Sequence, residues 1–183
     1  LVATNGSIKT SKGEVKIPTI CLEEESAKKI KQDEKTVTYN LDRLGIPLIE
    51  ITTAPTMFLP EQVKEAALKI GEILRSCDVR RGIGTIRQDI NINIRGHDKV
   101  EIKGFQDLKS IPKVIEYEVK RQIDLIKQGK KLSKEVRKAE QDFTTSFLRP
   151  LPGAARLYPE TDCMPVKIDK DYIAEIKNRF RNC

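Results

Sequence analysis

The sequence predicts an α+β fold, a largely antiparallel or mixed β-sheet cradle with about three packed helices. Short segments alternate between apolar and polar residues and are bounded by Gly or Pro, which is typical of strands. Longer segments carry apolar residues at three- and four-residue spacing, which is typical of amphipathic helices. The chain has 183 residues, 38% of them hydrophobic and 33% charged, so one domain with a real core is expected. Its apolar runs are too short for a membrane-spanning helix.

The first expected element is a β-hairpin near the N-terminus. Residues 7–9 and 14–17 alternate in polarity, and they flank Thr-Ser-Lys-Gly at 10–13. Gly13 supplies the positive φ that such turns often need.

Two further strands are expected at residues 36–43 and 46–53, joined at Gly45. The second is apolar on both pleat faces, which predicts a strand covered on both sides. Glu50 interrupts it. Because an unpaired buried carboxylate costs several kcal/mol, Glu50 needs a partner or a metal ion.

Three helices are expected. The first begins at Pro60, where a missing N–H does no harm, and ends near Cys77; its apolar stripe is Val63, Ala66, Ala67, Ile70, Ile73 and Leu74. The second has Ser110 as its N-cap, and its apolar residues are Ile111, Val114, Ile115, Val119 and Ile126. The third covers about 169–180. The Pro- and Gly-rich stretch 143–165 predicts an ordered loop.

Residues 86–94 and 100–103 predict a second hairpin with two different faces. Isoleucines alternate with polar residues, so one face is apolar and the other carries Arg87, Asp89, Asn91, Asn93, Glu101 and Lys103. A three-residue loop at 96–98 pairs Ile94 with Val100, whereas a four-residue loop mixes the two faces. We therefore expect the three-residue register.

The polar face of this hairpin has two interpretations. Half-solvated antiparallel sheets are common, so it could simply face water. Asn is depleted from strands, however, and Asn with Asp and Arg is also typical of a wall around a ligand or ion. The pattern alone leaves both open.

Carboxylates occur at unusual places. Glu23, Glu24 and Glu25 are consecutive, which fits an exposed helix start. With Glu50 and Asp89 they also fit a Mg²⁺ site, because Mg²⁺ prefers oxygen ligands. The single histidine of the chain excludes a site built from several histidines.

The net charge of +7 is concentrated between residues 120 and 138, where eight basic residues face two acidic ones. A solvated helix face and linker would look like this, and so would a surface that binds RNA. The second interpretation gives an alternative function, a non-catalytic RNA-binding fragment. The four cysteines form no Cys-x-x-Cys pair, which predicts reduced thiols in a cytoplasmic protein.

Five motifs occur in a specific order. They are Leu-Glu-Glu-Glu at 22–25, Asp-Arg-Leu-Gly-Ile-Pro-Leu-Ile-Glu-Ile at 42–51, Arg-Gln-Asp-Ile-Asn at 87–91, Val-Glu-Ile-Lys at 100–103 and Arg-Pro-Leu-Pro-Gly-Ala-Ala-Arg-Leu-Tyr-Pro-Glu-Thr-Asp at 149–162. Together they resemble the cradle domain of the B and E subunits of tRNA-dependent amidotransferases, from about residue 6 to 168. Residues 82–89 and 149–162 resemble the E type, which belongs to the archaeal glutamyl-tRNA(Gln) amidotransferase.

The resemblance implies a domain organisation. Residues 1–168 would be the catalytic cradle, incomplete at its N-terminus and lacking the insertion domain of E-type proteins near 128–140. Residues 169–183 would be a helix leading toward a missing helical and tail region. Such a fragment is expected to be inactive alone.

It also implies an activity, that of a carbon–nitrogen ligase. The family uses ATP and Mg²⁺ to phosphorylate the γ-carboxylate of Glu on misacylated tRNA(Gln), and ammonia then displaces phosphate to give Gln-tRNA(Gln). A partner of the D type, an asparaginase-like amidohydrolase, supplies the ammonia through a tunnel. A cytoplasmic heterotetramer with no membrane association is therefore expected.

Carried over by position, the resemblance implies site residues. The catalytic and metal-binding carboxylates are Glu24, Glu50 and Asp89, with Glu23 adjacent. Phosphate contacts are expected from Arg87, Arg149 and Arg156, since Arg forks match phosphate oxygens; each of them could instead form a structural ion pair. Tunnel or site walls are expected at Asn91, Asn93, Glu101 and Lys103.

Overall fold

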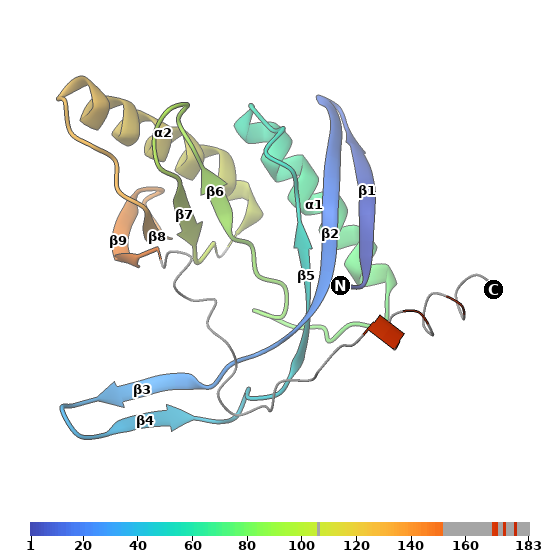
Figure 1. Cartoon of the computed structure of the whole chain (residues 1–183). Helices are drawn as coiled ribbons and strands as arrows, with labels where there is room; N and C mark the ends of the chain where they lie inside the picture. The colour runs from blue at the N-terminus through green and yellow to red at the C-terminus, as the bar shows by residue number, and fades with distance from the viewer. Residues whose placement is uncertain (106, 152–169, 172–173, 175–177, 179–183) are drawn as a thin grey trace. The chain divides into compact units, whose positions relative to one another are not determined.

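A computed structural model describes residues 1–105, 107–151, 170, 171, 174 and 178. Residues 1–151 form one compact unit. In chain order its elements are β1 (Ala3–Thr10), β2 (Gly13–Glu24), β3 (Lys28–Gln32), β4 (Val37–Asn40), β5 (Pro47–Thr52), α1 (Pro60–Ser76), β6 (Ile90–Ile92), β7 (Val100–Lys103), the 3₁₀ turn η1 (Leu108–Ser110), α2 (Ile111–Lys127), β8 (Glu135–Ala139) and β9 (Thr145–Pro150) (Figure 1). The predicted α+β class is confirmed.

The helix count differs from the prediction, because the described residues contain two α-helices rather than three. The third expected helix, at about 169–180, falls almost entirely outside the described residues, as does the predicted boundary at 168. None of the helices that the structure describes is long and apolar enough to cross a membrane.

The first sheet has the strand order β1-β2-β5 and is antiparallel throughout. The predicted N-terminal hairpin is confirmed: Thr10 pairs with Gly13, whose φ is 119°. The prediction that β5 is covered on both faces is wrong, because β5 is the edge strand and Ile49 is 48% exposed. Strands β2 and β5 continue past the part of the sheet that α1 covers, so their outer apolar residues lack a layer above them (Figure 1).

A separate two-stranded ribbon, β3–β4, branches from the first sheet (Figure 1). The expected strand at 36–43 is real but shorter, and it pairs with β3 rather than continuing next to β5. Strand β3 was not predicted, because its sequence has Ile30 as the only apolar residue and shows no alternation.

The second sheet has the order β6-β7-β8-β9. Strands β7 and β8 are parallel, and η1 and α2 form the crossover between them. Strand β8 lies in the segment for which a helix face and linker was one of two interpretations, and β9 lies in the segment predicted as a loop; the structure has a strand in each. The sequence signal is weak because Val136 and Ala139 are the only apolar residues of β8.

The predicted faces of the β6–β7 hairpin are correct, but its register is wrong by two residues. Ile92, not Ile94, pairs with Val100. A turn explains the longer loop: the His97 N–H donates to the Ile94 carbonyl at 2.9 Å, and the Asn93 amide donates to the His97 carbonyl at 2.6 Å. A shift by two leaves every side chain on its face, so alternation could not detect it.

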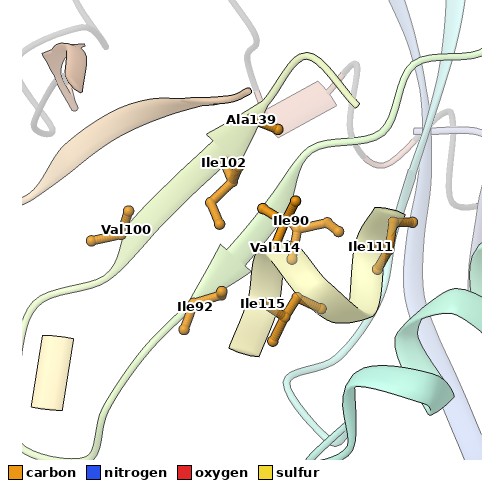
Figure 2. Close-up of a cluster of buried hydrophobic side chains, with 8 residues drawn as sticks. All are labelled: Ile90, Ile92, Val100, Ile102, Ile111, Val114, Ile115 and Ala139. Carbon is orange, nitrogen blue, oxygen red and sulfur yellow. The ribbon is translucent and has the colours of Figure 1, made fainter. Parts of the chain in front are cut away.

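The second sheet buries its apolar face under α2. Figure 2 shows Ile111, Val114 and Ile115 of α2 next to the isoleucines of β6 and β7. Helix α1 packs against the apolar clusters of both sheets. Ala66 belongs to the cluster of the first sheet, and Val63 and Ala67 pack against the cluster of the second. The polar residues of β6 and β7 therefore face away from α2.

A buried ion network fixes α2 to β8 and β9. The Glu118 carboxylate is fully buried and accepts hydrogen bonds from Arg121 at 2.7 and 2.9 Å, Gln122 at 2.8 Å and Thr145 at 2.7 Å. Arg137 of β8 lies 3.4 Å from it. Burial raises the pKa of Glu118, but these hydrogen bonds outweigh it and lower the pKa below its ordinary value.

The expected N-cap of α2 is corrected in one respect. Ser110 precedes the helix, but its side chain makes no capping bond to the helix. Its hydroxyl donates instead to the Asp107 carbonyl at 2.6 Å, and the Asp107 carboxylate caps the η1 turn.

Candidate catalytic site

Strand pairing brings two glutamates together on the first sheet. Glu50 of β5 lies opposite Cys21 of β2, and Glu23, two residues along β2, shares its face. The pKa of Glu50 is raised, mainly by a hydrogen bond with the Glu23 carboxyl and then by burial and the negative charges of Glu23 and Asp89. Two carboxyl groups in this position favour one shared proton or a bound cation.

The second sheet contributes a cation between two acids. Lys103 of β7 lies 2.6 Å from Asp89 and 3.0 Å from Glu101. Burial lowers the pKa of Lys103, but the two hydrogen bonds outweigh it and raise the pKa above its ordinary value. Asn91 pairs with Glu101 across β6 and β7 and lies on the same polar face.

These residues form one electrostatic group, because Asp89 and Lys103 both act on the pKa of Glu50. We call it the acidic cluster; its members are Glu23, Glu50, Asp89, Glu101 and Lys103. It holds four carboxylates and one ammonium group at the junction of β2–β5 with β6–β7. The cluster is therefore short of positive charge.

The fit of Mg²⁺ to the acidic cluster is partial. In residues 1–105 and 107–151, and the few described beyond them, no three acidic, His or Cys side chains converge as a formed metal site requires. The Glu23–Glu50 contact fits a cation in place of the shared proton. Asp89 is held by Lys103, so it would become a ligand only if that contact opened.

The structure separates Glu24 from the acidic cluster. Glu24 pairs with Pro47, one residue out of step with the Glu23 face, so strand alternation directs it to the opposite side of the sheet. The cluster therefore brings together Glu23, Glu50 and Asp89, whereas the motif resemblance assigned Glu24, Glu50 and Asp89, with Glu23 as an adjacent metal-binding residue.

The expected phosphate contacts lie in different environments. Arg87 forms an ion pair with Glu25 at 2.7 Å, with Arg87 52% exposed. Arg149 lies in β9, paired with Val136. Arg156 lies outside the described residues.

Two features of the site were missed from the sequence. Glu25 connects the end of β2 to Arg87 and was not assigned a role; the signal was its place in the acidic run. Asn93 stays a predicted wall residue, and its amide also donates to the His97 carbonyl and closes the β6–β7 loop. Neither contact follows from spacing, because the Arg87–Glu25 pair joins distant parts of the chain and the Asn93 contact depends on a turn.

Comparisons with known proteins agree with the motifs. Residues 1–174 match the model of the GatB/GatE catalytic domain. The chain is 56% identical over 126 residues to the E subunit of the glutamyl-tRNA(Gln) amidotransferase of Methanothermobacter thermautotrophicus, covering 69% of this chain and 20% of that protein. The same protein of Thermococcus sibiricus is 50% identical over 148 residues, covering 80% and 23%. That of Aeropyrum pernix is 54% identical over 128 residues, covering 69% and 20%.

The chain thus spans about a fifth of the length of these relatives. The family match covers nearly all of it, and within that match lie the acidic cluster and both sheets that carry it. This chain belongs to the GatB/GatE catalytic domain family.

Proposed function

We propose that this chain provides the kinase and transamidase centre of an ATP-dependent tRNA amidotransferase. The substrate is glutamate misacylated on tRNA(Gln), and the product is Gln-tRNA(Gln). The observation that supports this proposal is the acidic cluster, in which Glu23 raises the pKa of the Glu50 carboxyl, within the residues that match the family model.

The proposed reaction has two balanced steps. A γ-carboxylate oxygen of the substrate glutamate attacks the γ-phosphorus of ATP, and ADP leaves. Ammonia then attacks the resulting acyl phosphate; phosphate leaves with the bonding electrons, and a proton is lost to give the amide. Both steps place negative charge close to the acidic cluster, which repels it unless a cation is present.

Glu23 and Glu50 are the residues that would hold Mg²⁺, with Asp89 as a further ligand once it separates from Lys103. Bound Mg²⁺ would supply positive charge against the phosphoryl oxygens. The acids themselves provide a fixed, negatively charged wall, and a cation held by Glu23 and Glu50 would offset the repulsion between their two carboxyl groups. Glu24 remains a candidate from the motif resemblance alone.

Lys103 is proposed to orient the second half of the site. Its ammonium group holds Asp89 and Glu101 from opposite strands of the hairpin. When Asp89 is released, the same ammonium group is available to a phosphoryl oxygen. Asn91 and Glu101 form the polar wall next to it.

The partners are proposed from the family. The relatives are named as components of a glutamyl-tRNA(Gln) amidotransferase, so ammonia would come from an asparaginase-like amidohydrolase of the D type, in a cytoplasmic heterotetramer. ATP is a substrate, and Mg²⁺ is the expected metal.

The test uses the full-length protein with ammonium chloride, so that no amidohydrolase is needed. Gln-tRNA(Gln) formation and Mn²⁺ binding, followed by electron paramagnetic resonance, are measured for Glu23→Gln, Glu50→Gln and Asp89→Asn. We expect each variant to lose both. Glu24→Gln separates the two assignments, since the geometry predicts retained Mn²⁺ binding and the motif resemblance predicts its loss.

The matched control is Glu72→Gln, an exposed acid on α1. It should behave like the unchanged protein in both assays. If the three cluster variants retain metal binding and amidation, the proposed assignment is wrong.

The alternative function, an RNA-binding fragment without chemistry, receives less support. This alternative relies on the eight cations between residues 120 and 138. Two of them, Arg121 and Arg137, form ion pairs with Glu118 and Glu135. They stabilise the fold and are not free to contact RNA.

A further inference from the structure

Two loops meet at one end of the second sheet. Residues 93–99 lead into β7, and residues 128–134 lead into β8. These strands are parallel neighbours, with Val100 next to Glu135, so their preceding loops emerge side by side (Figure 1). Between them lies a hollow of about 560 Å³, lined by Gly96, His97, Asp98, Ile126, Gly129, Lys130, Lys131 and Leu132.

Much of the protein's excess positive charge lies in the two chain segments that border this hollow, and two of these cations, Lys130 and Lys131, line it. Residues 94–99 and 127–134 contain six cationic side chains and one carboxylate, a local charge of +5 against +7 for the whole chain. The cations are Arg95, Lys99, Lys127, Lys130, Lys131 and Lys134, and all six are exposed. We call these residues the basic pocket.

Ion pairs among the described residues neutralise little of this charge. Elsewhere in the described chain, Lys103, Arg121 and Arg137 contact two carboxylates each. Within the basic pocket, the one ion pair to a described acid is Lys134 with Asp98, at 3.8 Å. The C-terminus of α2 attracts cations with only about half a charge, and its last carbonyls already accept from Gln128, Gly129 and Lys130.

We propose that the basic pocket binds the phosphate backbone of the tRNA substrate. This inference rests on the proposed function, and it places an RNA contact away from the acidic cluster. Charge complementarity supports it, because several flexible Lys heads spread over two loops match a row of phosphates.

The test compares two triple variants of the full-length protein. Lys130→Gln, Lys131→Gln and Lys134→Gln together remove three charges from the pocket. Lys12→Gln, Lys16→Gln and Lys35→Gln remove three exposed charges from the first sheet and the β3–β4 ribbon. Dissociation constants for tRNA(Gln) are measured between 50 and 200 mM KCl, and thermal melts check that both variants fold.

The pocket variant should bind tRNA at least about fivefold more weakly at 100 mM KCl. Its plot of log Kd against log salt should flatten by roughly 0.9 for each phosphate that the variant no longer neutralises. With ammonium as donor, the KM for Glu-tRNA(Gln) should rise while kcat changes little. The control triple variant should keep the affinity and the slope.

Equal tRNA affinities for the two triple variants would overturn the proposal. A pocket variant that lost affinity for ATP but kept tRNA binding would also overturn it, because the occupant would then be a nucleotide. Failure of the proposed function looks different: the unchanged protein would form no Gln-tRNA, while tRNA binding would still depend on the pocket lysines.

Discussion

Two groups of carboxylates in this molecule are built from the same residue types and have opposite electrostatics. Glu118 is fully buried, yet Arg121, Gln122 and Thr145 satisfy it and lower its pKa. Glu50 is more exposed, yet Glu23 faces it and raises its pKa. Glu118 contacts two guanidinium groups, those of Arg121 and Arg137, whereas Glu50 faces a second carboxyl group.

The difference teaches how to separate a structural acid from a functional one. Burial alone does not separate them, because the more buried acid, Glu118, is the one that cations and donors neutralise. A fold gains stability when a carboxylate is surrounded by donors. A site that must accept a cation or a phosphoryl group keeps like charges together at a cost in stability. Four predictions test this comparison.

Removing the structural acid should have the largest effect. Glu118→Ala leaves Arg121 and Arg137 partly buried with Glu135 as their remaining acid, and breaking such a pair typically costs about 3–5 kcal/mol of unfolding free energy. Urea denaturation measures it. Glu116→Ala, an exposed position on the same helix, should change the value by less than about 0.5 kcal/mol; similar losses at both positions would contradict the structural role of Glu118.

Neutralising Glu50, the proposed metal-binding acid, should have the reverse effect on stability. Glu50→Gln removes repulsion between like charges, so the melting temperature at pH 7 should rise or stay unchanged. Amidation should fall at least about tenfold, the scale expected for a change close to a metal site. A variant that melts lower and remains active would place Glu50 with the structural acids.

The two acids should respond to pH with opposite signs. The pKa of Glu118 is lowered on folding, so its stabilising effect is present above the unfolded pKa of about 4.3 and is lost as the pH falls through the folded pKa. The pKa of Glu50 is raised, so its effect is present below the unfolded pKa and is lost as the pH rises through the folded pKa.

Denaturation of Glu118→Gln and Glu50→Gln between pH 3 and 8 checks these signs. Relative to the unchanged protein, the deficit of Glu118→Gln should shrink toward low pH. The advantage of Glu50→Gln should vanish there and grow toward neutral pH. Parallel curves for the two variants would contradict the comparison.

The smallest effect is expected at the Arg87–Glu25 pair. Arg87 is half exposed, so a double-mutant cycle with Arg87→Ala and Glu25→Ala should give a coupling of about 0.2–1 kcal/mol. A raised KM for ATP in Arg87→Lys, with unchanged stability, would show a phosphate contact in addition to the ion pair. An unchanged KM would leave Arg87 with its structural role.

Parts of the site were predictable because they depend on local periodicity. The polar face of Asp89, Asn91, Glu101 and Lys103 was correctly separated from the buried isoleucines. The register was not, since a two-residue shift preserves the faces. The choice between Glu23 and Glu24 was also beyond the sequence, because it depends on which β2 residue shares a face with Glu50.

Other parts of the fold have almost no local signal. Strands β3, β8 and β9 were missed or taken for loops, and β8 is rich in charge. Its Arg137 is tolerated in a sheet because Glu118, from a helix in another part of the chain, neutralises it. A long-range ion pair of this kind leaves no pattern in the strand itself.

The sequence by itself determined the α+β class, the N-terminal hairpin, the two helices α1 and α2, and the family. These follow from side-chain periodicity and from ordered motifs, which are properties of neighbouring residues. Only the tertiary structure decided which acids meet, which cations are neutralised and which remain around the basic pocket. Charges act through space, so their partners are set by strand register and loop position rather than by distance along the chain.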